Sequence, residues 1–551
     1  MTSSLDPIQL SILNQALRSI TEEMGANLVR SSFSTVIREA RDCSTAILTP
    51  DGEVVAQSAL IPMQTVALSE AFHGASQRVD LGRLTDGHAM LMNDPYAGGQ
   101  HLNDLILFQP VLFDGALLGY VGSTAHHIDI GGADAGINVR ATHLLQEGIV
   151  ISPMIFNIRN DWEHGNLESL ICANVRLPDI LRGDLNAQFA ANHIGIERLS
   201  ALARREGPDT VRQAMDAILD HGETRMRQAL ARIPDGVYHG SARMDRDVFD
   251  PIPIEVKVKV TVSGSDIELD YAGTHAQVAS MFNCPPASSR AAALSAIRCL
   301  VSDQKLPSND GCNRPIVSRF PEGSILNPHW PAPVRARAIV AYRAFDAILV
   351  ALAGAMPEQA TAPGFNTTTA VYISQQRQDG STRIYGDIFG GGLGAGQGYD
   401  GADAVDAIMS NCRCTPIEVI EHAHDHLRVA SFAIEPDSGG AGQWRGGLGF
   451  QRTFDILEDG ADVSIYSDRF RFAAQGLHGG TPGGLGALEV LRDGEKIRLD
   501  AMSTFPLKRG DRLTIRVGGG GGWGDPARRA SEAIQTDLVD GWVTHPPGVS
   551  A

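Results

Sequence analysis

The sequence predicts a multi-domain protein of the mixed α/β (α+β) class. Mixed sheets and amphipathic helices are expected in the N-terminal half, and a glycine-rich, β-dominated region in the C-terminal part. Three observations predict this class. The chain has 551 residues, too many for one simple core. Apolar residues recur at helical spacing in some segments and alternate with polar residues in others. The 59 glycines crowd into the last third.

The N-terminal segment begins with a predicted helix, with Asp6 as its N-cap and Pro7 at its first position. Two short strands around the turn Pro50-Asp51-Gly52 follow, and the segment 60–84 is expected to be helical in its second half. The apolar residues at helical spacing in the first helix are Ile8, Ile12, Ala16, Ile20, Met24 and Leu28.

A buried β-hairpin comes next, with Asp114-Gly115 at its bend. Residues 183–233 then predict two amphipathic helices, broken at Gly207-Pro208. Strict alternation from 254 to 274 predicts another hairpin, and the later apolar stretches predict helices around 287–303 and 335–355.

Beyond residue 360, glycine-rich stretches such as "FGGGLGAGQGYDGAD" and "RVGGGGGWGDP" recur without regular spacing. They predict either tight turns between short strands or loops whose backbone approaches another segment closely. We expect four parts: an α/β domain over 1–235 that bears the candidate metal site, an α+β middle domain over 236–360, a glycine-rich β-dominated domain over 361–527, and a tail over 528–551.

The formal net charge of −18 argues against nucleic acid or an anionic membrane as a partner, because both require a basic surface. No apolar stretch approaches the ~20 residues of a membrane span, and the N-terminus does not resemble a signal peptide. The seven scattered cysteines predict reduced thiols, so a cytoplasmic location is expected.

Two motifs, "GGQHLNDLIL" and "TAHHIDIGG", place histidine and aspartate between glycines and strand-like residues. His101 and Asp104 are three residues apart, so they share a side only in a turn or helix. On a strand His126 and His127 point to opposite faces, and Asp129 shares the face of His127. Hairpin-linked strands can thus gather His101, Asp104 and one of the two histidines. Two imidazoles and a carboxylate suit a divalent transition metal such as zinc, manganese or iron.

Asp42, on an early predicted strand, is a further carboxylate that can complete such a site. The alternative is structural: His101 caps a turn, and the His-His pair straddles a buried strand with backbone hydrogen bonds. His422, His424 and His426 alternate with polar residues and predict a solvated strand or loop. Cysteines at 412 and 414 lack the usual spacing of structural zinc sites and are expected in a loop or core.

Several signatures of nucleotide and hydrolase sites are missing. The sequence has no phosphate-binding G-x-x-x-x-G-K-[ST] loop, no G-x-S-x-G elbow and no H-E-x-x-H motif. "GGGLGAG" is not in a βαβ unit, so it is a weak dinucleotide signal. Five further cysteines are expected in the core: Cys43, Cys172, Cys284, Cys299 and Cys312.

Ordered motifs along residues 5–527 together resemble the hydantoinase B family. They include "NDPYAGGQHLNDL", "AHHIDIGG", "ANVRLPDILRGDLNAQFAAN", "RCLVSDQKLPSNDGCNRPI", "DSGGAGQWRGGLG" and "GGGGGWGDP". The resemblance implies a B subunit of an ATP-dependent hydrolase of cyclic amides such as hydantoins, lactams or 5-oxoproline. A separate hydantoinase A-type subunit would hold ATP and phosphorylate the substrate carbonyl, in a dimer of A–B heterodimers.

The resemblance also implies metal ligands. His101 and Asp104 match the family's ligands, the third falls on the "AHH" element with His126 favoured over His127, and Asp42 matches a family aspartate. Metal-bound water would then attack the activated carbonyl, with His127 or Asp129 handling its proton. The arginines expected to steady anionic intermediates, unless they serve as buried ion-pair partners, are Arg140, Arg176 and Arg314.

Two alternatives share this fold and site. One is a subunit of an ATP-dependent ketone carboxylase of the acetone or acetophenone carboxylase type. The other is a scaffold subunit whose metal is structural, in a closed four-ligand site without a water position.

Overall fold

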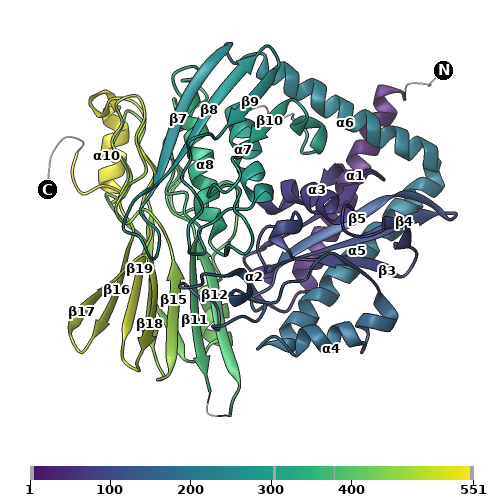
Figure 1. Ribbon diagram of the computed structural model, residues 1–551. Coiled ribbons are helices and arrows are strands. Elements are labelled where there is room, and N and C mark those ends of the chain that lie inside the picture. Colours follow the sequence, from purple (N-terminus) through teal and green to yellow (C-terminus); the bar gives the residue numbers. More distant parts are fainter. Residues whose placement is uncertain (1–4, 302–305, 378, 547–551) are drawn as a thin grey trace.

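The computed structural model describes residues 5–301, 306–377 and 379–546 (Figure 1). Its N-terminal part is built around a six-stranded antiparallel sheet in the order β2-β1-β5-β4-β3-β6. The strands are β1 (Cys43–Leu48), β2 (Val54–Gln57), β3 (His88–Met92), β4 (Asp104–Phe113), β5 (Ala116–His126) and β6 (Met154–Asn157). The predicted hairpin is confirmed, since β4 pairs with β5 across a turn in which Asp114 (φ 49°) and Gly115 (φ 81°) are left-handed.

Helices cover both faces of this sheet, so the N-terminal part is a three-layer α/β structure. Two consecutive residues of β1 point to the two faces. Ile47 packs into the core with α1 (Pro7–Ser31) and α5 (Pro178–Glu206), and Leu48 packs into the core with α3 (Pro62–Ser76). The predicted break between two long helices is confirmed, because α5 ends at Glu206 with Gly207 as its C-cap and α6 (Pro208–Leu230) begins with a proline.

One detail of the predicted helices is wrong, and another is refined. Helix α3 occupies the first part of segment 60–84 and ends at Ser76, because its start is set by Pro62 at the first helical position. In α1 the buried face runs from Leu13 to Leu28, and Ile8 and Ile12 lie off this face and are exposed.

The middle part has a four-stranded sheet in the order β10-β9-β8-β7, in which β10 is parallel to β9. Its strands are β7 (Gly236–Met244), β8 (Ile254–Ser263), β9 (Asp266–Asp270) and β10 (Ile316–Arg319). The predicted 254–274 hairpin is confirmed. Two helices pack beside it, α7 (Pro286–Val301) and α8 (Arg337–Leu352), as the apolar stretches predict. Helix α8 is buried along nearly its whole length, so its polar residues lie inside the molecule.

The C-terminal part contains two antiparallel sheets that share one apolar core. One has the order β12-β11-β15-β18, and the other β13-β14-β19-β16-β17. The strands are β11 (Thr369–Gln376), β12 (Thr382–Phe389), β13 (Leu427–Ile434), β14 (Phe450–Ile456), β15 (Ala461–Tyr466), β16 (Ala487–Arg492), β17 (Glu495–Leu499), β18 (Met502–Leu507) and β19 (Arg512–Arg516). The glycine-rich, β-dominated C-terminal region is therefore confirmed.

The glycine-rich stretches pack backbone against backbone, which decides between the two sequence-based alternatives. Residues 518–522 lie against segments around Leu393, Ser438 and Gly447, joined by hydrogen bonds such as Gly520 N to Gly447 O at 2.9 Å. A Cβ on Gly520 would lie 2.0 Å from Leu393 O, and one on Gly519 2.0 Å from Ser438 O. Only glycine allows this approach, so close packing and not turn geometry explains these residues.

The remaining helices are short: α2 (Thr35–Arg38), α4 (Asn166–Cys172), α9 (Ile417–Ala423) and α10 (Ser531–Val539). Part of the predicted tail is anchored, since Arg529 binds Asp400 at 2.8 Å and Asp537 at 2.7 Å. Among the described residues, no helix combines the length and the hydropathy that crossing a membrane requires. The four-part domain division stays a prediction.

Candidate metal centre

The structure brings His101, Asp104 and His126 together, as the two motifs predict. Asp104 is the first residue of β4 and pairs directly with His126, the last residue of β5. His101 reaches the same point from the preceding turn, which is closed by a hydrogen bond from Asp104 N to His101 O. One ligand atom of each side chain lies within 4.8 Å of the other two, and all three residues are buried.

The two imidazoles have the properties of metal ligands. Burial, with the charge of Arg337, holds the pKa of His101 well below its ordinary value, and burial lowers the pKa of His126 to about 4. Both rings are therefore neutral at pH 7 and keep a lone pair free for a metal. Among the described residues, neither ring nitrogen of His101 has a hydrogen-bond partner, although Nε2 lies 3.1 Å from Asp104 Oδ1. Such a spacing is near the ~3 Å that separates ligands of one ion bound at ~2 Å.

Asp42 lies beside the cluster without being one of its three members. Its Oδ2 is 3.6 Å from His126 Nδ1, and its Oδ1 accepts a hydrogen bond from Gln64 Nε2 at 2.7 Å. Burial and the nearby charge of Asp104 raise the pKa of Asp42 to about 8. Burial also raises the pKa of Asp104, but His101 and Arg337 outweigh it and hold that pKa well below its ordinary value. A divalent cation would relieve the repulsion between the two buried carboxylates.

Three supporting residues come from distant segments that the sequence reasoning did not identify. Arg337 Nη2 donates to Asp104 Oδ2 at 2.8 Å, which leaves Oδ1 facing the imidazoles. Tyr372 OH lies 3.3 Å from His126 Nε2 and accepts a hydrogen bond from Arg335 at 3.1 Å. The contact with Tyr372 fixes the orientation of the His126 ring, so that its Nδ1 faces Asp42 and Asp104. A sequence signal existed, since "PVRARAIVAY" sets two arginines in an apolar stretch.

The structure does not bring His127 and Asp129 into the cluster. His127 points to the other face of β5, where its Nε2 lies 3.0 Å from Gln188 Oε1 of α5. Asp129 accepts hydrogen bonds from the backbone N–H groups of Gly131, Arg176 and Leu177, so it holds a loop together.

The three arginines expected at the substrate also have other contacts. Arg140 lies over the ring of Phe249, 5.3 Å from its centroid. Arg176 donates to the carbonyls of Gly132 and Ala133. Arg314 forms a partly exposed ion-pair group with Glu53, Asp220 and Glu223.

The expected solvated loop at residues 422–426 is wrong for two of its three histidines. His422 is exposed at the end of α9, but His424 and His426 are buried, the first against the Tyr385 ring and the second beside Arg383. Cys412 and Cys414 lie in a loop against the core, as expected.

Comparison with known proteins identifies the family. The family model described as Hydantoinase B/oxoprolinase matches residues 6–526. A putative D-/L-hydantoinase B subunit from a Pseudomonas species is 31% identical, over 98% of this chain and 93% of that protein.

Two solved structures have the same fold. The ATP-dependent caprolactamase of Pseudomonas jessenii matches with a TM-score of 0.90 and 25% identity, over 98% of this chain and 95% of that one. An acetone carboxylase in its nucleotide-free form matches with a TM-score of 0.89 and 17% identity, over 98% and 78% of the two chains. The chain belongs to the hydantoinase B/oxoprolinase family.

Proposed function

We propose that this chain is the B subunit of an ATP-dependent hydrolase of cyclic amides of the hydantoin, lactam or 5-oxoproline type. A hydantoinase A-type partner holds ATP and phosphorylates the substrate carbonyl, in a dimer of A–B heterodimers. The observation that carries the proposal is the buried cluster of His101, Asp104 and His126 in a chain that resembles a hydantoinase B subunit over nearly its full length.

The donor set of the cluster fits zinc, manganese or iron, with Asp42 as an adjacent second carboxylate. A divalent ion held there would act as a Lewis acid and would lower the pKa of a water molecule toward ~7. The chain's own contribution is orientation: Arg337 holds one oxygen of Asp104, and Tyr372 holds His126. His127 takes no part in this proposed chemistry, because its ring contacts Gln188 of α5 and points away from the cluster.

The test is ATP-dependent ring opening by the chain with its cognate A-type partner. Hydantoin, 5-oxoproline and caprolactam are offered separately, each with ATP and without it. The proposal is supported if at least one ring is opened and if this opening requires ATP, both chains and the metal. ATP hydrolysis without ring opening, in the presence of all three rings, argues against it.

The carboxylase alternative shares the fold, as the acetone carboxylase match shows. The same preparation is therefore offered acetone or acetophenone with labelled bicarbonate. Incorporation of the label into an acid-stable product would show carboxyl transfer. The carboxylase assignment would then replace the hydrolase assignment. If instead metal removal leaves turnover unchanged, the metal takes no part in the chemistry, as the scaffold alternative expects.

Replacing Arg337 with methionine tests the support of the cluster. Arg337 is almost fully buried and is the ion-pair partner of Asp104 Oδ2. Without it we expect metal affinity to fall about 10–100-fold, the usual cost of losing a supporting contact behind a ligand. Metal titration of the apo-protein measures this, with Arg319→Met, an exposed arginine paired with Glu268, as control. Equal affinity in the wild type and Arg337→Met would contradict the role of Arg337.

A further inference from the structure

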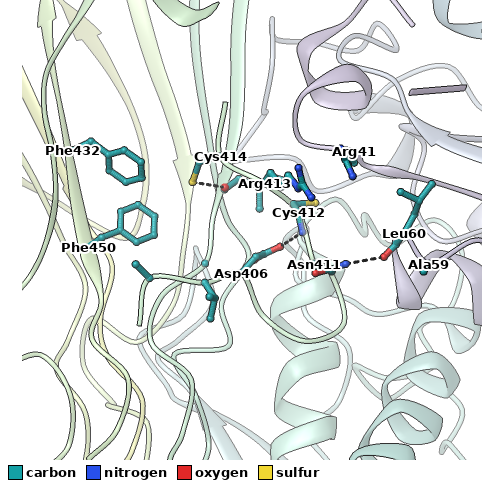
Figure 2. Close-up of a pocket in the computed structure, with 14 residues that line it drawn as sticks. Arg41, Ala59, Leu60, Asp406, Asn411, Cys412, Arg413, Cys414, Phe432 and Phe450 are labelled. Carbon is teal, nitrogen blue, oxygen red and sulfur yellow. Dashed lines mark hydrogen bonds between the residues drawn. The ribbon is translucent and has the colours of Figure 1, made fainter. Parts of the chain in front are cut away.

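A cavity of about 410 Å³ lies where the N-terminal part meets the C-terminal sheets (Figure 2). Its volume is within the ~300–1,000 Å³ of small-molecule sites. Hydrogen bonds join its walls: Arg413 N donates to Ala40 O at 3.1 Å, and Asn411 Nδ2 to Leu60 O at 3.1 Å. The cavity is therefore a feature of the contact between two parts of the fold.

Two arginines line the cavity without an acidic partner. Arg41 is half-buried and Arg413 is exposed, and neither guanidinium has a hydrogen bond or ion pair within the described ranges. The carboxylate that also lines the cavity is Asp406. Its oxygens already accept hydrogen bonds from Ala407 N, Ser410 Oγ and Cys412 N. Burial raises the pKa of Asp406 to about 6.

The other side of the cavity is aromatic. Phe432 and Phe450 stand there edge to face, with ring centroids 5.2 Å apart. Figure 2 shows the two rings on one side and Arg41 on the other, with Asp406 and Cys412 between them. The thiols in the wall are not nucleophiles, because burial raises the pKa of both Cys412 and Cys414. The cavity thus offers a cationic end and an apolar end.

One residue of the cavity wall is next in the chain to a side chain that lies beside the metal cluster. Arg41 immediately precedes Asp42, and its backbone is left-handed (φ 61°), a conformation that costs energy for a non-glycine residue. The charges of Asp42 and Asp406 both act on Cys412 in the cavity wall. Arg41 therefore connects the cavity wall through the chain to Asp42, which lies beside the candidate metal centre.

We propose that this cavity binds a small organic anion, with its oxyanion on Arg41 and Arg413 and its apolar body against Phe432 and Phe450. Arginine forks suit carboxylate and phosphoryl oxygens alike, so the shared chemistry is an oxyanion on an apolar body. The use of the cavity for a substrate rests on the function proposed above, but the binding itself does not. If substrate occupies the cavity, the function proposed above is limited to an anionic substrate or intermediate.

Binding is measured by calorimetry on the isolated full chain, without ATP or partner, with benzoate, phenyl phosphate and neutral benzamide as probes. We expect both anions to bind and benzamide to bind much more weakly. Arg413→Gln should weaken both anions about tenfold, the loss of one charge-assisted contact. Tighter binding of phenyl phosphate identifies a phosphoryl end, and tighter binding of benzoate a carboxylate end; both orders support the site.

The matched control is Arg509→Gln, an exposed arginine of the C-terminal part that should leave all three affinities unchanged. Circular dichroism melting verifies that Arg413→Gln is folded. Equal anion affinity in the wild type and Arg413→Gln, equal affinity for benzamide and benzoate, or no anion binding at millimolar concentration would each overturn the proposal. None of these outcomes bears on the metal cluster, and failed ring opening does not bear on the cavity.

Discussion

Replacing His126 with alanine is expected to abolish metal binding, whereas the same change at His127 is not. The two histidines are adjacent and both are buried, so their replacement removes the same volume from the same stretch of chain. Only His126 faces His101 and Asp104, and His127 faces Gln188 on the other side of the sheet. The pair therefore separates the loss of a ligand from the loss of a buried ring.

The expected loss of metal affinity in His126→Ala exceeds about 100-fold, because a ligand contributes more than the supporting residues behind it. His101→Ala should behave in the same way. Metal content is measured by plasma mass spectrometry on the wild type and the three variants, and circular dichroism verifies folding. Near-stoichiometric metal in His126→Ala, or equal losses in His126→Ala and His127→Ala, would contradict the assignment of the cluster.

Gly520→Ala is expected to prevent the C-terminal part from folding. The added Cβ would lie 2.0 Å from Leu393 O and 2.2 Å from Leu393 C, both backbone atoms. Leu393 cannot retreat freely, because its N–H donates to Ala402 O and its carbonyl accepts from Gly447 N. We expect a loss in the free energy of unfolding of more than about 4 kcal/mol, in the range of the most damaging single substitutions.

The control for this clash is Gly354→Ala. A Cβ at Gly354 would meet no atom of the described residues within 4 Å, and its φ lies outside the left-handed range. This change should alter stability by no more than about 0.5 kcal/mol. Soluble yield and urea unfolding compare the two variants with the wild type. Equal unfolding midpoints for all three would mean that the glycine segments are not packed as the structure shows.

Elements defined by local signals could be predicted from the sequence. Asp114-Gly115 has the turn chemistry of a two-residue hairpin, and Gly207-Pro208 separates two helices because proline can begin a helix but not continue one. The packing of glycines could not be predicted, since the partners of Gly520 lie more than 70 residues away in the chain. The wrong prediction for His424 and His426 has the same cause, because β12 supplies their neighbours Tyr385 and Arg383.

In the candidate site, too, local contacts could be predicted from the sequence and long-range contacts could not. His101, Asp104 and His126 lie on one hairpin and its preceding turn, so spacing and strand alternation are sufficient to gather them. Arg337 is separated from Asp104 by 233 positions, and Tyr372 from His126 by 246. No local pattern connects such residues, so the sequence points to Arg140, Arg176 and Arg314 instead.

We propose that imidazole nitrogens and carboxylate oxygens of this chain hold one divalent metal ion. X-ray absorption at the edge of the co-purified metal tests it most directly, because it reports the ligand atoms themselves. We predict a first shell of nitrogen and oxygen at about 2.0–2.2 Å with imidazole scattering, lost in His126→Ala. Sulfur at about 2.3 Å would instead place the metal on cysteines such as Cys412 and Cys414, and would contradict the account.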